Sequence, residues 1–512
     1  MTGFSLLLRG GLVADGTGAT PAARDVAVVG RRIALVEPGA VVEADETVDV
    51  SGMVVAPGFI DAHTHSDTTA LAAADGLLEA EQAFAAVRQG VTVEVAGNCG
   101  SSAFPGTYSG LAALARAHAG VGRTNHLVSL VGHGSLRAAV VGPEARPASG
   151  AEIARMAQLL DESLAAGAVG LSTGLIYTPG SYADTDEVTA LARVAARHGK
   201  PYVTHLRDEM SGVEGALAEA VAIARDSGAA LHVSHHKTAG RFAWGRTETT
   251  LPMLADLRAS GMDVTCDVYP YTAGSTNLPA MLPPWAHDGG LPRLLERLRD
   301  PLQRDLMRTA IDEGVPGWEN TVGNGGWDRI SVASARRHPE YQGRTVAELA
   351  AARAVDALDL VAELLVDEDG DVTIISHSMR EDDVRRVLAA PFAMIGSDGV
   401  PKPGLPHPRW AGTFSRVLGH YAREAGLFGL AEAVRKMTGA TAARFGLTGR
   451  GVLRDGAHAD VVVFDPERVA DRATFEDPLA APEGVLMVVV GGAVVVRDGE
   501  VLRARPGRVL AC

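Results

Sequence analysis

The sequence predicts an α/β protein: a (β/α)8 barrel with a small β-domain formed by both ends of the chain. Two observations support this fold class. The centre of the chain alternates short, almost continuously apolar runs with longer alanine-rich stretches, a pattern typical of parallel β-α-β units. Both ends instead carry short β-type runs separated by glycine and aspartate, which predict a small sheet or sandwich.

The predicted β-domain combines residues 1–58 with residues 450–512. Neither end is large enough to bury a good core alone, so we expect the two ends to fold together. The expected strands are Leu6–Leu8, Asp25–Val29, Ile33–Val36 and Thr47–Val50 at the start, and Asp460–Phe464, Gly484–Val490 and Ala493–Val496 at the end.

The predicted barrel covers residues 59–449, and nine strand candidates compete for its eight places. They are Phe59–His63, Val91–Ala96, His126–Val131, Ala168–Thr173, Tyr202–His205, Ala230–His235, Asp263–Tyr269, Val372–Ser376 and Phe392–Gly396. Helix candidates between them include Ala151–Ala166 and Thr185–His198. We expect Val372–Ser376 to be the surplus strand, because it follows a long stretch with proline and tryptophan, at about 272–344, that resembles an insertion.

Composition excludes several classes of partner. The net charge of −15 leaves no basic stripe to neutralise phosphates, which argues against nucleic-acid binding. The longest apolar runs, such as Val485–Val496, contain glycines and are too short to span a bilayer.

The cysteines indicate a reducing compartment, because the chain has only three of them, Cys99, Cys266 and Cys512, which is an odd number. Met1–Gly11 has no basic region and no cleavage-like site, so the predicted location is the cytoplasm.

Side chains that bind metals recur where five predicted barrel strands end. His63 and His65 lie two residues apart and would face the same side of a strand. This pair alone means little, because 16 histidines in 512 residues are enough to produce a His-x-His by chance. The other strand ends carry Cys99, His205, His235 and Asp398. Because the strand ends of a barrel meet at one face, and imidazole, thiolate and carboxylate all bind zinc, the six residues together predict a zinc site.

Longer motifs surround these residues. Pro57-Gly-Phe-Ile-Asp-Ala-His63-Thr-His65, the later single histidines and Asp398 resemble the amidohydrolase superfamily. A closer resemblance, to the D-aminoacylase (N-acyl-D-amino-acid deacylase) family, covers almost the whole chain from about Phe4. It is carried by Gly97-Asn-Cys99-Gly, Ser172-Thr-Gly-Leu-Ile-Tyr177, His205-Leu-Arg-Asp-Glu, Ser234-His235-His-Lys237, Asp267-Val-Tyr269-Pro-Tyr, Asp398-Gly and His407-Pro-Arg409.

The resemblance implies a metal-dependent hydrolase barrel and a division of the metal ligands. Cys99, His205 and His235 would hold the tighter zinc, while His63, His65, Cys99 and Asp398 would define a weaker second site. Many superfamily members bridge two metals with a carboxylated lysine on the fourth strand, but the stretch Gly170-Leu-Ser-Thr-Gly has no lysine. Its absence agrees with the D-aminoacylase pattern and leaves open whether the second site is filled.

The activity that the resemblance implies is zinc-dependent hydrolysis of the amide bond of an N-acyl-D-amino acid, a small-molecule substrate. Zinc polarises a carbonyl oxygen and lowers the pKa of bound water. Asp398 is the candidate catalytic base, which would take the water proton and return it to the leaving nitrogen; a role as metal ligand only is the alternative. The preference for the D-isomer rests on the resemblance alone.

A free α-carboxylate on the substrate needs a cation. Lys237 lies two residues beyond His235 and would face the same side if the strand persists, and Arg409 offers a bidentate fork. For an arbitrary lysine or arginine, a solvent-facing charge is the usual alternative, so both predictions depend on their motifs. The resemblance supports Lys237, Arg409, Tyr177 and Tyr269 as substrate contacts, with Ser275 as a weaker candidate. His133 would either line the pocket or have a structural role.

The predicted substrate preference rests on the absence of a basic residue from one segment of the chain. Family members that act on acidic substrates carry a basic residue just beyond the tyrosine motif, whereas Asn277–Trp285 has none, which favours apolar side chains such as those of D-Leu, D-Met or D-Phe. Alternative functions are a dipeptidase for peptides with a C-terminal D-residue, a cyclic amidase of the hydantoinase or dihydroorotase kind, and a non-catalytic barrel scaffold. The sequence leaves open the acyl group, the number of metals, the oligomeric state and the pathway.

Overall fold

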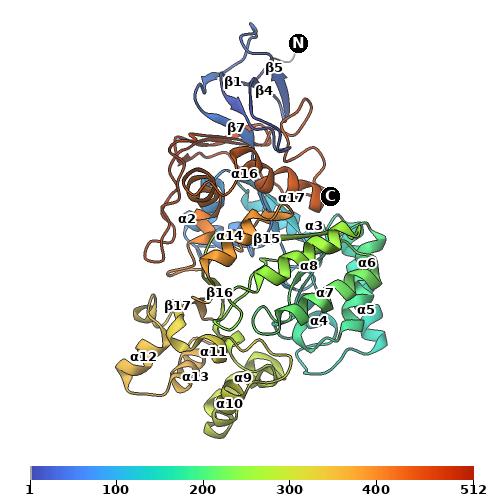
Figure 1. The fold of residues 1–512 in the computed structure, drawn as a ribbon, viewed down its shortest axis with the longest axis vertical. Coiled ribbons are helices and arrows are strands. Elements are labelled where there is room, and N and C mark those ends of the chain that lie inside the picture. Colours follow the sequence, from blue (N-terminus) through green and yellow to red (C-terminus); the bar gives the residue numbers. More distant parts are fainter. Residues whose placement is uncertain (1–2) are drawn as a thin grey trace.

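A closed eight-stranded barrel occupies the centre of the protein (Figure 1). The structure is a computed structural model that describes residues 3–512, so the first two residues of the predicted range 1–58 lie outside the described part. The barrel strands are β8 (Phe59–Asp61), β9 (Val91–Ala96), β10 (His126–Ser129) continued by β11 (Val131–Gly132), β12 (Leu171–Gly174), β13 (Tyr202–His205), β14 (Leu231–Val233), β15 (Val264–Val268) and β19 (Ala393–Ile395).

Neighbouring barrel strands pair in parallel, from β8 through β9 and β10 and from β11 to β15 and β19. The circle closes where the Ala62 N–H donates to the Ile395 carbonyl at 3.2 Å. Apolar strand residues such as Val93 and Val203 pack in one cluster with Phe445, while others pack against the surrounding helices. The predicted (β/α)8 fold class is confirmed.

Helices surround the barrel between its strands. They are α1 (Thr69–Ala74), α2 (Ala80–Arg88), α3 (Leu111–Val121), α4 (His133–Val140), α5 (Gly150–Ala165), α6 (Thr185–Arg197), α7 (Val213–Ser227), α8 (Thr247–Ala259), α14 (Glu381–Ala389), α15 (Arg409–Arg416) with a π-helical continuation Val417–Glu424, α16 (Leu430–Met437) and α17 (Gly439–Phe445). A capping box of Ser149 and Glu152 begins α5 and defines where this barrel helix starts.

The surplus strand candidate lies outside the barrel. β18 (Thr373–Ser376) is the middle strand of an antiparallel sheet with β16 (Gly274–Asn277) and β17 (Ile330–Ser334). Helices α9 (Gly290–Arg299), α10 (Pro301–Glu313), α11 (Thr321–Gly325), α12 (Val346–Arg353) and α13 (Ala357–Asp367) complete this unit, which we call the insertion lobe (residues 274–376). It lies at the opposite end of the molecule from the β-domain (Figure 1).

The insertion lobe is longer than the predicted insertion at about 272–344. Its own apolar core includes Leu349 of α12, Leu360 and Leu364 of α13, and Ile374 of β18, so the lobe continues to the end of β18. The apolar patterns of α12 and α13 are typical of helices that cover a sheet. Such a pattern does not show whether the covered sheet is the barrel or the small antiparallel sheet. The sequence therefore could not place this boundary.

Both chain ends form the β-domain, as predicted. One sheet has the order β5-β4-β1-β6, from β1 (Leu6–Arg9), β4 (Asp25–Val29), β5 (Arg32–Val36) and β6 (Thr47–Asp49). The other has the order β23-β22-β21-β20-β7-β2-β3, from β2 (Leu12–Val13), β3 (Ala22–Ala23), β7 (Val54–Pro57), β20 (Val461–Phe464), β21 (Val485–Val490), β22 (Ala493–Arg497) and β23 (Glu500–Val501). Residues of both ends, such as Leu8 and Val489, share one core between the sheets.

The last residues of the chain leave the β-domain and pack on the barrel. The Leu127 N–H donates to the Arg508 carbonyl at 2.9 Å, and the Leu510 N–H donates to the Leu127 carbonyl at 2.8 Å. The Cys512 N–H then reaches the Gly167 carbonyl at 3.0 Å. The end of the predicted range 450–512 is thus an arm along β10 rather than part of the sandwich. Across the described residues 3–512, no helix combines the length and the apolar character needed to cross a membrane.

Candidate metal centre

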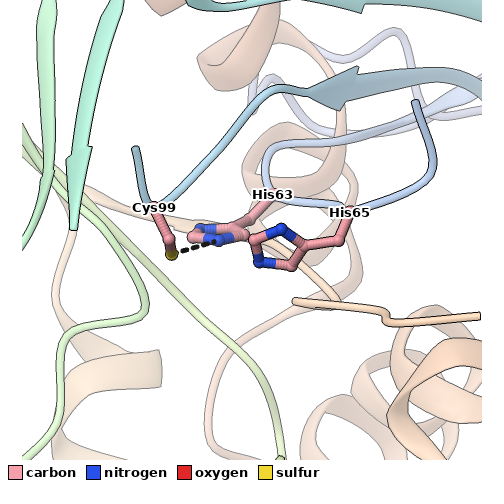
Figure 2. A group of neighbouring side chains, drawn as sticks. All are labelled: His63, His65 and Cys99. Atoms are coloured by element: carbon pink, nitrogen blue, oxygen red, sulfur yellow. Dashed lines mark hydrogen bonds between the residues drawn. The ribbon is translucent and has the colours of Figure 1, made fainter. Parts of the chain in front are cut away.

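The six predicted metal ligands meet at the carboxyl ends of the barrel strands. The Cys99 Sγ lies 3.3 Å from His63 Nε2, 3.3 Å from His235 Nε2 and 3.8 Å from His205 Nδ1. Figure 2 shows the thiol pointing at the ring of His63, with His65 beside it. Asp398 completes the group, because its Oδ1 lies 3.2 Å from His65 Nε2 and 3.5 Å from His63 Nε2.

The donor set fits zinc. Three overlapping groups have their ligand atoms within 4.8 Å of one another: Cys99, His205 and His235; His63, His65 and Cys99; and His63, His235 and Asp398. Burial opposes ionisation of the Cys99 thiol, but His63 and His235 outweigh it and hold the thiol pKa well below its usual value. A thiolate among imidazoles and a carboxylate, almost all buried, is the environment in which proteins bind zinc.

The backbone is strained at three of these residues. Cys99, His235 and Asp398 have φ angles of +50°, +32° and +49°, in the left-handed region that residues other than glycine rarely adopt. Gly174 at the end of β12 allows the Cys99 loop to approach, because a Cβ at this position would lie 2.1 Å from the Cys99 carbonyl oxygen. Such strain persists only where the surrounding structure enforces it, and it concentrates at functional sites.

A cavity of about 780 Å³ opens in front of the metal centre. Tyr177, Lys237, Tyr269 and Ser275 lie on its wall, as do Met281 and Leu282 of the insertion lobe. The Tyr177 ring packs edge-on against the His205 ring, and its hydroxyl accepts a hydrogen bond from the Thr276 hydroxyl at 3.1 Å. The cavity therefore brings four of the predicted substrate contacts to the metal centre.

The two predicted carboxylate-binding cations are not solvent-facing. The Lys237 Nζ lies 2.5 Å from Glu209 Oε2 and donates to the His235 carbonyl at 3.1 Å. Arg409 is 1% exposed, and its Nη2 lies 3.0 Å from Asp398 Oδ2 and donates to the Ser275 carbonyl at 3.2 Å. The Arg409 Nε and Nη1 have no hydrogen-bond partner among the described residues, so two buried donors remain free beside the metal centre.

Comparison with known proteins places the chain in a family. The model of the amidohydrolase family matches residues 46–496, most of the chain. The chain belongs to the amidohydrolase family. The resemblance found in the sequence is therefore confirmed at the level of the family.

Proteins similar to this amidohydrolase match it over nearly their whole length. D-aminoacylase of Alcaligenes xylosoxydans xylosoxydans is 39% identical over 99% of this chain and 98% of its own. A solved structure of D-aminoacylase has a TM-score of 0.84 at 38% identity, and the match covers 99% of this chain and 100% of the other. That structure comes from work on a binuclear metal centre with one-metal activation and second-metal attenuation. N-acyl-D-glutamate deacylase of Bordetella bronchiseptica, solved with zinc and a phosphonate mimic of the tetrahedral intermediate, has a TM-score of 0.83 at 36% identity over 100% of both chains.

Two carboxylates that contact the histidines of this amidohydrolase's metal centre, Glu209 and Asp267, were not predicted as site residues. Glu209 Oε2 lies 3.3 Å from His205 Nε2, and its Oε1 lies 3.1 Å from His235 Nδ1. Asp267 lies 3.4 Å from His63 Nδ1 and accepts the His235 N–H at 3.0 Å. Carboxylates near the second ring nitrogen of a histidine favour its orientation toward a metal; the Glu209 contacts are ion-pair distances, because neither His205 Nε2 nor Glu209 Oε1 has a hydrogen-bond partner among the described residues. Both residues belong to motifs of the resemblance, and this position in the motifs was the only signal for them.

The contacts of His133 support a structural role, one of the two roles predicted for it. It is fully buried, and its Nε2 lies 2.7 Å from Glu187 Oε1, which belongs to α6. Arg137 pairs with the same carboxylate. These contacts tie α4 to α6.

Proposed function

We propose that this amidohydrolase hydrolyses the amide bond of N-acyl-D-amino acids with the help of zinc, releasing a carboxylate and a free D-amino acid. The observation that carries the proposal is the arrangement of one thiolate, four histidines and Asp398 beside two unpaired, buried guanidinium donors of Arg409. The first group suits a metal that activates an amide, and the second suits the carboxylate of an amino acid. The likeness to D-aminoacylase over nearly the whole chain supports the same activity.

The proposed metal ligands form two sets that share Cys99. Cys99, His205 and His235 would hold one tightly bound zinc, and His63, His65, Cys99 and Asp398 would form a weaker second site. Zinc bound by these residues would supply a Lewis acid for the amide carbonyl and would lower the pKa of bound water. Glu209 and Asp267 keep the histidine rings in place from behind.

Asp398 is the proposed catalytic base. Burial alone would raise its pKa, but Arg409 and His63 outweigh burial and keep the pKa well below its usual range. The carboxylate is therefore ionised before reaction and can accept a proton from the attacking water. Returning this proton to the amide nitrogen lets the amine leave, so one residue serves as base and then as acid.

Five residues are proposed to hold the substrate. The α-carboxylate would accept hydrogen bonds from Nε and Nη1 of Arg409, the donors left free in the structure. Lys237, whose ammonium pairs with Glu209, would be a further donor on the cavity wall, and Tyr269 and Ser275 line the same region. Burial and the neighbouring Cys99 raise the pKa of Tyr177 well above its usual value, so its hydroxyl stays protonated and can donate to the scissile carbonyl.

We propose a preference for apolar side chains. Met281 and Leu282 on the cavity wall are consistent with this preference. Lys402 also reaches the wall, but its ammonium is paired with Asp371 at 2.9 Å. The side chains of Met281 and Leu282 offer a substrate carboxylate neither a hydrogen bond nor a charge in exchange for its hydration. The size of the cavity also admits a peptide with a C-terminal D-residue, the second candidate substrate.

The test is amine release from paired substrates. N-acetyl-D-leucine, N-acetyl-L-leucine and N-acetyl-D-glutamate are incubated with the protein, with added zinc and after removal of metal by a chelator. We expect zinc-dependent release from the D-leucine compound and much less from the other two. Release from D-glutamate alone would contradict the apolar preference. Release from none of the three, despite bound zinc, would favour a dipeptide or cyclic-amide substrate instead.

We also propose the remaining features expected from the sequence. The chain divides into a β-domain from residues 1–58 and 450–512, apart from the C-terminal arm along β10, and a catalytic barrel from residues 59–449 that carries the insertion lobe. The protein acts on a small molecule in the cytoplasm, with no nucleic-acid or membrane partner. Three free cysteines and the net charge of −15 support these proposals.

A further inference from the structure

One carboxylate of the insertion lobe, that of Glu319, lies on the cavity wall beside the metal centre. Glu319 Oε2 accepts a hydrogen bond from the Glu209 N–H at 2.7 Å. Glu319 is 9% exposed, and its carboxylate lies within 4.8 Å of ligand atoms of Glu209 and His205. The lobe therefore contacts the residue that orients two of the proposed zinc ligands.

The backbone around Glu319 is packed into the insertion lobe. Trp318 and Val322 on either side are buried in the apolar core of the lobe. The Asn320 side chain accepts the Gly323 N–H at 2.9 Å, which caps α11, and donates to the Ile311 carbonyl of α10 at 2.6 Å. Glu319 is thus held by the lobe from both directions along the chain.

The Glu209 N–H depends on this one acceptor. Glu209 is 2% exposed, and no other acceptor for its N–H occurs within residues 3–512. A buried N–H without an acceptor is unfavourable, so loss of the Glu319 oxygen would displace the Glu209 backbone. The Glu209 side chain contacts His205, His235 and Lys237, and such a displacement would disturb all three.

We propose that Glu319 is a positioning residue through which the insertion lobe holds Glu209, and thereby His205 and His235, in the arrangement that binds zinc. The inference rests on the metal site of the proposed function. The role requires an acceptor oxygen rather than a negative charge, and a glutamine provides such an oxygen at the same distance from the backbone.

Zinc affinity measures this role without reference to catalysis. Competition with a chelating dye compares the wild-type chain with Glu319→Gln, Glu319→Ala, Glu319→Leu and Glu313→Ala. Glu313 is the control, because it is an exposed glutamate at the end of α10 in the same lobe. We expect Glu319→Ala and Glu319→Leu to bind zinc roughly tenfold more weakly, the lower end of the effect of residues that support metal ligands. Glu319→Gln and the control should stay within about twofold of wild type.

Two results would overturn the inference. Wild-type affinity in both Glu319→Ala and Glu319→Leu would show that the contact does not hold the site, and equal weakening in Glu319→Gln would show that charge matters instead. The leucine variant keeps the bulk of the side chain, and the circular dichroism of each metal-free variant checks that the chain is folded. If the wild-type chain itself does not bind zinc, the proposed function fails first.

Discussion

Replacing Arg409 by lysine separates two roles that the structure combines in one guanidinium. Its Nη2 pairs with Asp398, while Nε and Nη1 are free for the substrate carboxylate. A lysine keeps the positive charge beside Asp398 but offers a point donor instead of a planar fork. We therefore expect one charge-assisted hydrogen bond to the substrate to be lost and the ionisation of Asp398 to be retained.

The expected magnitude follows from that one bond. A hydrogen bond to a charged group contributes about 1.5–3 kcal/mol, which corresponds to a loss of about 10- to 150-fold in kcat/KM. The assay compares N-acetyl-D-leucine with N-isopentylacetamide, which has the same amide and alkyl chain but no carboxylate. The loss should appear with the amino acid derivative only. An equal loss with both substrates would refute the reasoning, because Arg409 would then act through Asp398 rather than through the carboxylate.

Two further predictions concern the framework of the site. Gly174→Ala should destabilise the protein by about 1–3 kcal/mol and weaken zinc binding, because the new methyl group would meet the Cys99 carbonyl oxygen; urea unfolding and zinc titration measure both effects. Gly150→Ala is the control, since open space surrounds this helical glycine, and equal behaviour of the two variants would contradict the prediction. Asp460→Asn should cost about 2 kcal/mol at pH 7, because His126 and Arg450 outweigh burial and lower the pKa of Asp460 from its usual 3.8 to about 2. This contribution is complete above about pH 4 and is lost as the pH falls through about 2, so the difference in unfolding free energy should fall to roughly half at pH 3; a difference that does not change with pH would contradict it.

The barrel and its strand ends could be predicted because each depends on a local pattern. His205, for example, is the last residue of an apolar run, and parallel strands in a barrel place all such residues at one face. The position of Cys99 also followed from its place after β9, although its positive φ did not. The sequence therefore predicted which six side chains would meet, without the backbone geometry that brings them together.

The supporting contacts could not be predicted, because they depend on where separate segments meet in space. Glu209 lies four residues after His205, in a loop whose direction depends on the turn that Asp208 forms with the N–H groups of Met210 and Gly212. Glu319 is 110 residues farther along the chain, in a lobe whose boundary was itself misplaced. The pairing of Arg409 with Asp398 likewise requires the structure, since each residue alone suggested a separate role.

The discontinuous β-domain sets the order in which this protein can fold during synthesis. β7 ends at Pro57, and its antiparallel partner β20 starts at Val461, about 400 residues later. At a synthesis rate of about 5–20 residues per second, roughly 20–80 s pass between the synthesis of β7 and that of its partner β20. The edge of β7 stays unpaired during this time. During that time the apolar face around Leu8 and Val55 lacks Val461 and Val489 to cover it. An unpaired strand with an exposed apolar face is prone to aggregate, so the nascent chain should require chaperone protection until its last strands are made.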